Sequence, residues 1–376
     1  MPTSQITINL KKLKANFAKI QDFVGNEVSI MSVIKSNGYG HGLEACARAL
    51  VEAGAKWFAV ADLDEAEIVR KISRDVAVLI LGPVAMSDYG RALSGGFRLM
   101  VGDKAGLDFL NTKAEIYGKR VPIHLKINTG MNRFGVDSSR AVDYFETIEK
   151  LPNIYIEGVY THLYNSSDLA TTKMQWKKFS EVLFDLQRRG FEVPVRHMEA
   201  SNAILNFDQG FFEIIRPGLL IYGLAGRKEI HTKPVLSWTA KIVALRRVKK
   251  GENISYNHFP AKKDLDLAII GVGYADGYPR SLSDKAEILV SGKRCKVVGN
   301  INMNYTFVDI SSAMRVSTKM SPQVGDEVIL VGGDLASEPN DLPDEIIVAD
   351  LARWAGTNEY EIVSRLPYGA ERVYLD

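Results

Sequence analysis

Hydrophobic positions in the first two-thirds of the chain alternate between a helical and a strand-like pattern. Apolar residues recur at spacings of three and four over residues 10–24, which marks one face of a helix. Residues 28–34 follow as a short continuous apolar run, a pattern typical of a buried strand. The next helical stripe covers residues 43–51 and ends before Gly54. Cys46 lies on that stripe, so we interpret it as a core residue rather than a reactive thiol.

The same alternation continues to about residue 228. Further strands are predicted at residues 57–60, 76–81, 97–101, 121–127, 155–160, 195–199 and 212–215, with helical patterns notably at 62–72, 139–151 and 171–189. Eight strands alternating with helices over about 220 residues favour a (β/α)8 TIM-type barrel, with a doubly wound sheet as the open alternative. We place this domain at residues 8–228.

The pattern changes in the last third of the chain. Strands are predicted at residues 235–248, 265–272, 287–290, 295–298, 305–310 and 327–331, and only residues 349–355 have a helical pattern. A Ser-Gly pair at residues 291–292 predicts a hairpin turn. The fold class is therefore α/β plus β, with a C-terminal, mostly β domain at residues 229–376. Residues 1–7 are a candidate for pairing with it.

Composition excludes several classes of protein. The 376 residues are 46% hydrophobic, and 47 basic against 45 acidic residues give a net charge of +2. This balance gives no reason to expect nucleic acid or a membrane as partner, and no apolar run approaches the roughly 20 residues of a membrane span. The two cysteines, Cys46 and Cys295, exclude a disulfide scaffold and a cysteine zinc site, and we expect no metal. The first residues lack the apolar core of a signal peptide, so we expect a cytoplasmic protein.

The first barrel strand runs into residues 33–42, VIKSNGYGHG. Lys35 is then at the C-terminal end of a strand, where barrel enzymes place their catalytic groups. Three glycines within five residues allow the backbone to approach a ligand closely. Taken alone, the segment also fits a solvated lysine before a turn.

Further motifs follow in order along the chain. They are HLKINTGMNRFG at residues 124–135, YTH at 160–162, His197 with Ser201, RPGLLIYG at 216–223, ISY at 254–256, GYADGY at 273–278, GNINM at 299–303 and NEYE at 358–361. As a collinear set, they resemble the motifs of the alanine racemases. The resemblance implies a barrel that binds pyridoxal 5′-phosphate (PLP), a C-terminal β domain, and a homodimer whose active sites are shared between subunits.

The resemblance also assigns roles to individual residues. Lys35 holds the cofactor, Arg216 faces the pyridine nitrogen, and Tyr256 is a second base that His162 assists. The implied phosphate ligands are Tyr39, Ser201, Gly218, Leu219 and Tyr360. Arg133, Met303 and Tyr274 are the implied substrate contacts, and Lys126 is at a position where many family members carry a carbamylated lysine.

These residue types suit racemisation. An α-carbanion is too unstable in water unless a conjugated cofactor delocalises its charge, and the lysine that holds that cofactor must lose its proton. Arginine cannot give up a proton to the ring nitrogen, which favours brief proton removal over transamination. Proton transfer on both faces of a planar carbon needs two acid/base groups, here Lys35 and Tyr256.

Several positions depart from the family pattern. Asn128 replaces an aspartate, Asn257 replaces a glycine, Asn302 and Asn304 flank Met303, and EASN replaces ANSA at residues 199–202. We therefore expect interconversion of L- and D-alanine, supplying D-alanine for peptidoglycan precursors. A racemase of broader specificity, or one for serine or basic amino acids, remains open, and so does, less favoured, a PLP decarboxylase of related fold.

Overall fold

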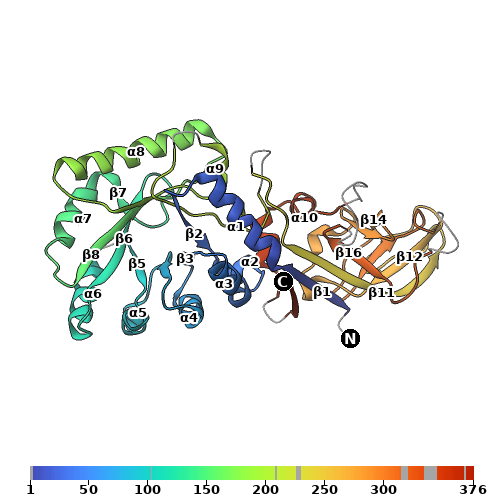
Figure 1. Ribbon diagram of the computed structural model, residues 1–376. Coiled ribbons are helices and arrows are strands. Elements are labelled where there is room, and N and C mark those ends of the chain that lie inside the picture. The colour runs from blue at the N-terminus through green and yellow to red at the C-terminus, as the bar shows by residue number, and fades with distance from the viewer. Residues whose placement is uncertain are drawn as a thin grey trace. The chain divides into compact units, whose positions relative to one another are not determined.

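Two compact units make up the chain in a computed structural model that describes residues 3–102, 104–207, 210–225, 230–314, 321–333, 345–367 and 370–376 (Figure 1). The α/β unit contains Leu13–Tyr39 and Leu43–Lys233. The β unit contains the chain from Pro234 onward, together with residues 3–12 and Gly40–Gly42. The sequence-based boundary after residue 228 lies outside the described residues, as do residues 368–369 of the tail.

Eight parallel strands form the predicted barrel. In chain order they are β2 (Ser29–Val33), β3 (Trp57–Val60), β4 (Ala77–Ile80), β5 (Arg98–Val101), β6 (Val121–Asn128), β8 (Ile154–Tyr160), β9 (Val195–His197) and β10 (Ile214–Ile215). Hydrogen-bonded ladders join them in the order β10-β2-β3-β4-β5-β6-β8-β9. A single bridge between Ala200 and Arg216 links the two ends, so the barrel is nearly closed. The (β/α)8 prediction is confirmed.

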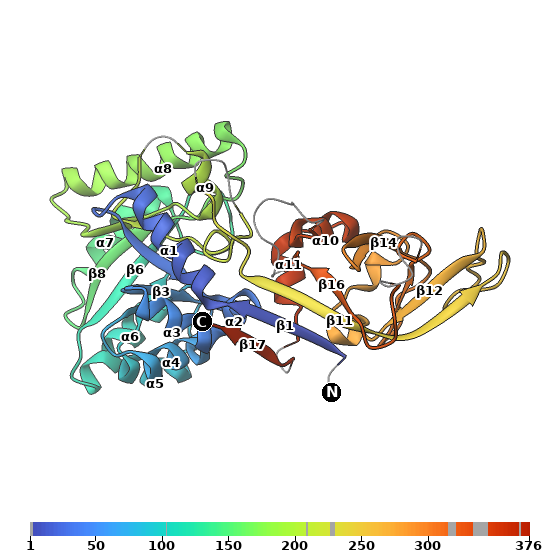
Figure 2. The ribbon, with the colours of Figure 1, turned by 45° about the vertical axis from the view of Figure 1, so that its right-hand side comes forward.

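The barrel helices lie around these strands (Figures 1 and 2). They are α1 (Leu10–Val24), α3 (Leu43–Glu52), α4 (Leu63–Ile72), α5 (Tyr89–Gly95), α6 (Ala105–Ile116), α7 (Ala141–Ile148), α8 (Leu169–Arg188) and α9 (Ser201–Asn206). Helix α4 begins after Asp62, whose side chain accepts the Glu65 N–H, and it ends near Arg70 and Lys71, whose charges suit a helix C-terminus.

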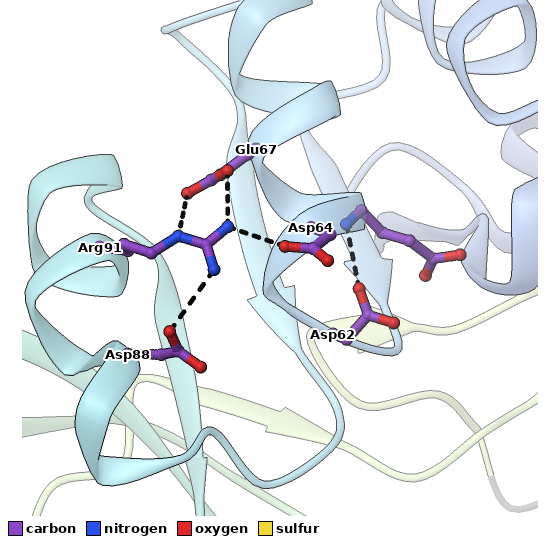
Figure 3. A network of polar contacts seen from close by, with 6 residues as sticks. Asp62, Asp64, Glu67, Asp88 and Arg91 are labelled. Atoms are coloured by element: carbon purple, nitrogen blue, oxygen red, sulfur yellow. Dashed lines mark hydrogen bonds and ion pairs between the residues drawn. The ribbon is translucent and has the colours of Figure 1, made fainter.

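An exposed ion network joins α4 to the start of α5 (Figure 3). The Arg91 guanidinium donates to both carboxylate oxygens of Glu67 at 3.0 and 2.9 Å and to Asp64 at 2.7 Å. Asp88, in the 3-10 turn Met86–Asp88, lies 3.4 Å from the same guanidinium. Because these groups face water, the network contributes little to folding stability and mainly orients neighbouring helices.

The β unit is built around six antiparallel strands. They are β11 (Leu236–Val248), β12 (Leu265–Ile270), β13 (Glu287–Val290), β14 (Lys293–Val297), β15 (Thr306–Asp309) and β16 (Glu327–Val331). The pairings β12-β15-β14-β13-β16-β11 return to β12, so the six strands form a closed ring. Strand β1 (Ser4–Asn9) lies antiparallel to the first half of β11, and β17 (Arg372–Leu375) lies parallel to β1 (Figure 2).

The described residues contain some elements that sequence patterns did not predict. Strand β7 (Val136–Asp137) has two residues, too few for a periodic signal. The β unit has a second helix, α11 (Glu359–Ser364), besides the predicted helix α10 (Val348–Ala355). Its six residues form a helix because the Asn358 side chain caps its N-terminus and Ile362 and Val363 are buried. Within the described part of the chain, every helix falls short of the length or apolar character that a membrane span requires.

Candidate active site

Five predicted site residues of the barrel lie where its strands end. Lys35 follows β2, Lys126 is near the end of β6, His162 follows β8, and Ser201 and Arg216 follow β9 and β10. The strand register pairs residue 126 with residue 160, and residue 160 with residue 197, so these positions lie at one level of the barrel. Their clustering at the C-terminal ends of the strands is the usual arrangement of a barrel active site.

The backbone after Lys35 winds in the left-handed sense. Ser36, Asn37 and Tyr39 have φ angles of 55°, 56° and 53°, and Gly38 between them has a φ of 61°. Each non-glycine residue in this conformation costs roughly 1–2 kcal/mol relative to the right-handed form. Such a turn persists only where its surroundings hold it in place.

Glu65 supplies part of that support. Its carboxylate, buried in the first turn of α4, accepts the N–H groups of Asn37 at 2.9 Å and Ala61 at 3.0 Å. The Asn37 side chain in turn accepts the Leu43 N–H at 2.9 Å. Sequence reasoning missed Glu65. A glutamate three positions after Asp62 indicates only a capping box, whereas here the carboxylate ties the lysine-bearing turn to the end of β3.

We expect Glu65→Gln to destabilise the protein by about 1–3 kcal/mol, because each carboxylate oxygen accepts one N–H group and the amide NH2 that replaces one oxygen would face a donor. Urea denaturation measures this change in the free energy of unfolding. Glu67→Gln, on the same helix but in the exposed network, is the matched control and should cost less than about 1 kcal/mol. Equal losses in the two variants would contradict the assigned role of Glu65.

Lys126 is buried and Lys35 is half-buried, and both lie near positive charges. Burial and the Arg133 cation lower the pKa of Lys35, and Glu65 acts in the opposite direction. Burial and three neighbouring cations, of which Arg133 acts most strongly, lower the pKa of Lys126 to about 8. Both amines are therefore more easily deprotonated than an exposed lysine, which makes them better nucleophiles.

Arg216 is buried and contacts neutral groups. Its Nη1 donates to Nδ1 of His197 at 2.7 Å, and its Nη2 donates to the carbonyls of Thr161 at 2.8 Å and Met198 at 3.0 Å. Its Nη2 also lies 3.5 Å from Nδ1 of His162. Burial lowers the pKa of Arg216 to about 10, so the guanidinium stays charged at neutral pH.

His162 is held in its neutral form. Burial, followed by the charge of Arg216, lowers the pKa of His162 to about 3. Because Nδ1 faces the Nη2 donor of Arg216, the ring carries its proton on Nε2. The Nε2–H is then available as a hydrogen-bond donor.

Four predicted phosphate ligands meet beside the last two barrel strands. Oγ of Ser201 accepts the Gly218 N–H at 3.0 Å. A Cβ at Gly218 would lie only 2.6 Å from Oη of Tyr39, so glycine is required there. The Leu219 N–H has no hydrogen-bond acceptor in the part of the chain that the structure describes. Loops after the seventh and eighth strands are the usual phosphate site of this fold, and here they offer hydroxyl groups and the free Leu219 amide.

Asn128 shapes the loop that carries Arg133. Its Oδ1 accepts the N–H groups of Gly130 at 3.1 Å and Asn132 at 3.0 Å. Its Nδ2 donates to Oδ1 of Asn132 at 2.8 Å. The asparagine therefore holds this loop through a side-chain oxygen, an acceptor that an aspartate at the same position would also offer.

In the β unit, Tyr256 lies within a turn of the backbone at residues 255–258. Its flanking residues Ser255 and Asn257 have φ angles of 63° and 66°, and its side chain is 68% exposed. Asparagine tolerates this conformation better than most residues, which explains how Asn257 replaces the family's glycine. Asn300 donates to the Tyr256 carbonyl at 3.0 Å, and Asn302 Oδ1 lies 2.9 Å from Ser255 Oγ.

The same unit brings Tyr274 and Met303 next to this turn. The Tyr274 N–H donates to the Asn302 carbonyl at 3.1 Å, and the Ala275 N–H donates to the Met303 carbonyl at 2.9 Å. Tyr256, Tyr274 and Asn302 line one recess on the surface of the unit. Tyr360, in α11, is half-exposed and does not line this recess.

A deprotonatable lysine at the mouth of a (β/α)8 barrel, beside a cradle for a phosphate, defines the class of enzymes that hold a phosphorylated cofactor on a lysine. Two family models match the chain, "Alanine racemase, N-terminal domain" over residues 8–226 and "Alanine racemase, C-terminal domain" over residues 235–374. The chain belongs to the alanine racemase family.

Individual relatives agree with the family models. Alanine racemase of Halothermothrix orenii is 34% identical over 98% of this chain and 95% of its own. The crystal structure of the Bacillus anthracis enzyme with bound L-Ala-P is 28% identical, with a TM-score of 0.86 over 100% and 96% of the two chains. A Bartonella henselae alanine racemase with covalently bound pyridoxal phosphate, 24% identical with a TM-score of 0.87 over 100% of both chains, shares the fold.

Proposed function

We propose that Lys35 and Tyr256 are the two acid/base groups of this PLP-dependent alanine racemase, one on each face of the substrate α-carbon. The family interconverts L- and D-alanine and so supplies D-alanine for peptidoglycan precursors. The observation that carries the proposal is the half-buried Lys35 amine, which follows the first barrel strand at its C-terminal end and whose pKa is lowered.

The residues of the barrel fit PLP. The cradle of Ser201, Gly218, Leu219 and Tyr39 suits the phosphate, because it offers hydroxyls and amides. The Lys35 amine suits the aldehyde carbon, and we assign Tyr360 to the phosphate as well. When bound, the cofactor delocalises the negative charge left on the α-carbon after proton removal.

Arg216 is the proposed partner of the pyridine nitrogen. The guanidinium donates and keeps its proton, so it cannot protonate the ring. Such a partner limits how long negative charge is stored on the ring, which suits proton removal and return. This argument disfavours a decarboxylase, whose chemistry favours an acidic partner at this nitrogen.

His162 is the proposed partner of the Tyr256 phenol. Its Nε2–H can donate to the phenolate oxygen and stabilise that anion, while its Nδ1 faces Arg216. We assign Tyr256 to the site of a second copy of the chain, which makes the enzyme a homodimer. Large exposed side chains on the β unit, Tyr256, Tyr274, Met303 and Tyr305, support such a covered face.

Substrate binding is assigned to Arg133, Met303 and Tyr274. The Arg133 guanidinium can pair with the substrate carboxylate, and Tyr274 is placed at the entrance. We assign the enzyme to the cytoplasm, which agrees with Cys46 and Cys295 being buried and not joined in a disulfide.

Lys126 is the proposed site of a carbamate. The neutral amine adds to CO2 and releases a proton, and the resulting anion offsets the surrounding cations and pairs with Arg133. Because the pKa of Lys126 is about 8, the reactive neutral form is present at pH 8 and is lost as the pH falls below it. We expect a carbamate signal by 13C NMR with labelled bicarbonate at pH 8.5 and none at pH 6. Lys126→Ala should lack that signal, and a signal that persists in it would exclude this lysine.

The reaction itself is tested by chiral analysis of products. The purified enzyme with PLP is offered L-alanine, L-serine and L-lysine in separate reactions. The proposal is supported if D-alanine forms much faster than D-serine and D-lysine. Faster racemisation of serine or lysine, or release of CO2, would overturn the substrate assignment.

A further inference from the structure

Two buried histidines in the barrel have no part in the proposed proton transfers. His124 of β6 and His197 of β9 (the imidazole pair) contact each other through Nδ1 of His124 and Nε2 of His197, 2.7 Å apart. The remaining nitrogen of His197, Nδ1, accepts from Arg216 at 2.7 Å. The remaining nitrogen of His124, Nε2, lies 3.1 Å from Oε2 of Glu157. A continuous chain of hydrogen bonds therefore joins Glu157 to Arg216.

The position of every proton in this chain follows from its two ends. Arg216 can only donate, so Nδ1 of His197 is an acceptor and its proton is on Nε2. That proton is donated to Nδ1 of His124, which places the proton of His124 on Nε2, facing the Glu157 carboxylate. Both rings are neutral, because burial lowers the pKa of each imidazole. Any other tautomer would set two donors or two lone pairs against each other.

The surrounding residues hold both rings at this spacing. The Tyr160 ring stacks on His197, with centroids 4.6 Å apart and an interplanar angle of 6°. The Trp57 ring meets His124 edge-on at 6.0 Å. A Cβ at Gly158 would lie 2.7 Å from Nδ1 of His124, the atom that accepts from the other ring. The glycine therefore makes room for the contact within the imidazole pair.

Glu157, at the other end of this chain of hydrogen bonds, is ionised at neutral pH. Arg98, the first residue of β5, donates to both of its oxygens at 2.9 and 3.0 Å. Burial alone would raise the pKa of Glu157, but hydrogen bonds from His124 and Arg98 outweigh it, and the pKa is lowered. Glu199, also near Arg216, is a weaker candidate for this role, because burial raises the pKa of Glu199 to about 7.

We propose that Glu157 acts through the imidazole pair as a positioning residue for Arg216. The carboxylate stabilises, from the other end, the same two tautomers that Arg216 selects, and without it His124 would leave its Nε2–H without an acceptor. The tautomer of His197 presents the lone pair that holds the buried guanidinium in one orientation. The inference rests on the proposed role of Arg216 at the cofactor ring. The tautomers themselves can be measured whatever reaction the enzyme performs.

Three variants separate this role from that of an ordinary ion pair. Glu157→Met removes the acceptor for His124. Glu157→Gln keeps an amide oxygen that can accept from His124, while it removes the charge and one of the two acceptors of Arg98. Arg98→Met removes the ion pair but leaves the carboxylate. Each is compared with the wild-type holoenzyme by 15N-histidine NMR at neutral pH and by the kcat for L-alanine.

We expect both imidazoles of the pair to carry their proton on Nε2 in the wild type, in Glu157→Gln and in Arg98→Met. In Glu157→Met, we expect a second tautomer and a loss of kcat of about tenfold, the size typical when the partner of a directly acting group is removed. Wild-type tautomers in Glu157→Met would overturn the proposal, and so would equal effects of Glu157→Met and Arg98→Met. A second tautomer in Glu157→Met, together with a wild type that does not racemise alanine, would contradict the proposed function and leave the positioning role of Glu157 intact.

Discussion

Lys35→Ala is expected to abolish both racemisation and the covalent attachment of PLP. The variant has no amine to bond the cofactor carbon and no base on that face of the substrate, so kcat should fall by at least about 10³-fold. Borohydride reduction followed by peptide mass mapping measures the attachment. In the wild type, the reduced cofactor should be found on Lys35.

Lys126→Ala is the matched control for this result. Lys126, like Lys35, is a lysine of the site whose pKa is lowered in part by Arg133, but it has no assigned bond to the cofactor. The control should still be labelled at Lys35. A wild-type label on any lysine other than Lys35, or a label retained in Lys35→Ala, would remove the basis of the cofactor assignment.

Tyr256→Phe is expected to block turnover by about 10²–10⁴-fold, because the variant loses one of two acid/base groups. The side chain is exposed in the β unit and its hydroxyl holds no hydrogen bond within the described residues, so folding should be unaffected. Tyr305→Phe, which removes a hydroxyl from another exposed tyrosine of this unit, is the control and should retain activity.

Mixing the two inactive variants tests whether sites are shared between subunits. A heterodimer of Lys35→Ala and Tyr256→Phe chains has one site with both bases intact. Random exchange makes half of the dimers mixed, so about a quarter of wild-type activity should return. No recovery, with heterodimers verified by native mass spectrometry, would show that each site is built within one chain.

Sequence patterns predicted the barrel well because its strands are buried on both faces and read as apolar runs. The run at residues 28–34 became β2, and even the two-residue β10 was found within residues 212–215. Helix α11 was missed because six residues are too few for a helical period, and its capping residue Asn358 acts through a hydrogen bond. A capping residue alone is weak evidence for a helix when no apolar residues recur at helical spacing after it.

The site residues were predicted from sequence motifs, and the structure adds contacts between residues that lie far apart in the sequence. Lys35 was predicted, but its support by Glu65, from a different βα segment, depends on tertiary contact. His197 was noted only as the start of a motif, and its contact with His124 joins residues that are 73 positions apart. Asn257 looked like a departure until its positive φ showed that it meets the same backbone demand as glycine.

The exchange of the substrate α-proton in Tyr256→Phe tests the two-base account most directly. The variant, loaded with PLP, is incubated in deuterated solvent with D-alanine or L-alanine, and deuterium at the α-carbon is followed by NMR. If Lys35 takes the proton from D-alanine and Tyr256 takes it from L-alanine, D-alanine should exchange while L-alanine exchanges far more slowly. Equal exchange of the two enantiomers would contradict the assignment of Lys35 and Tyr256 to opposite faces.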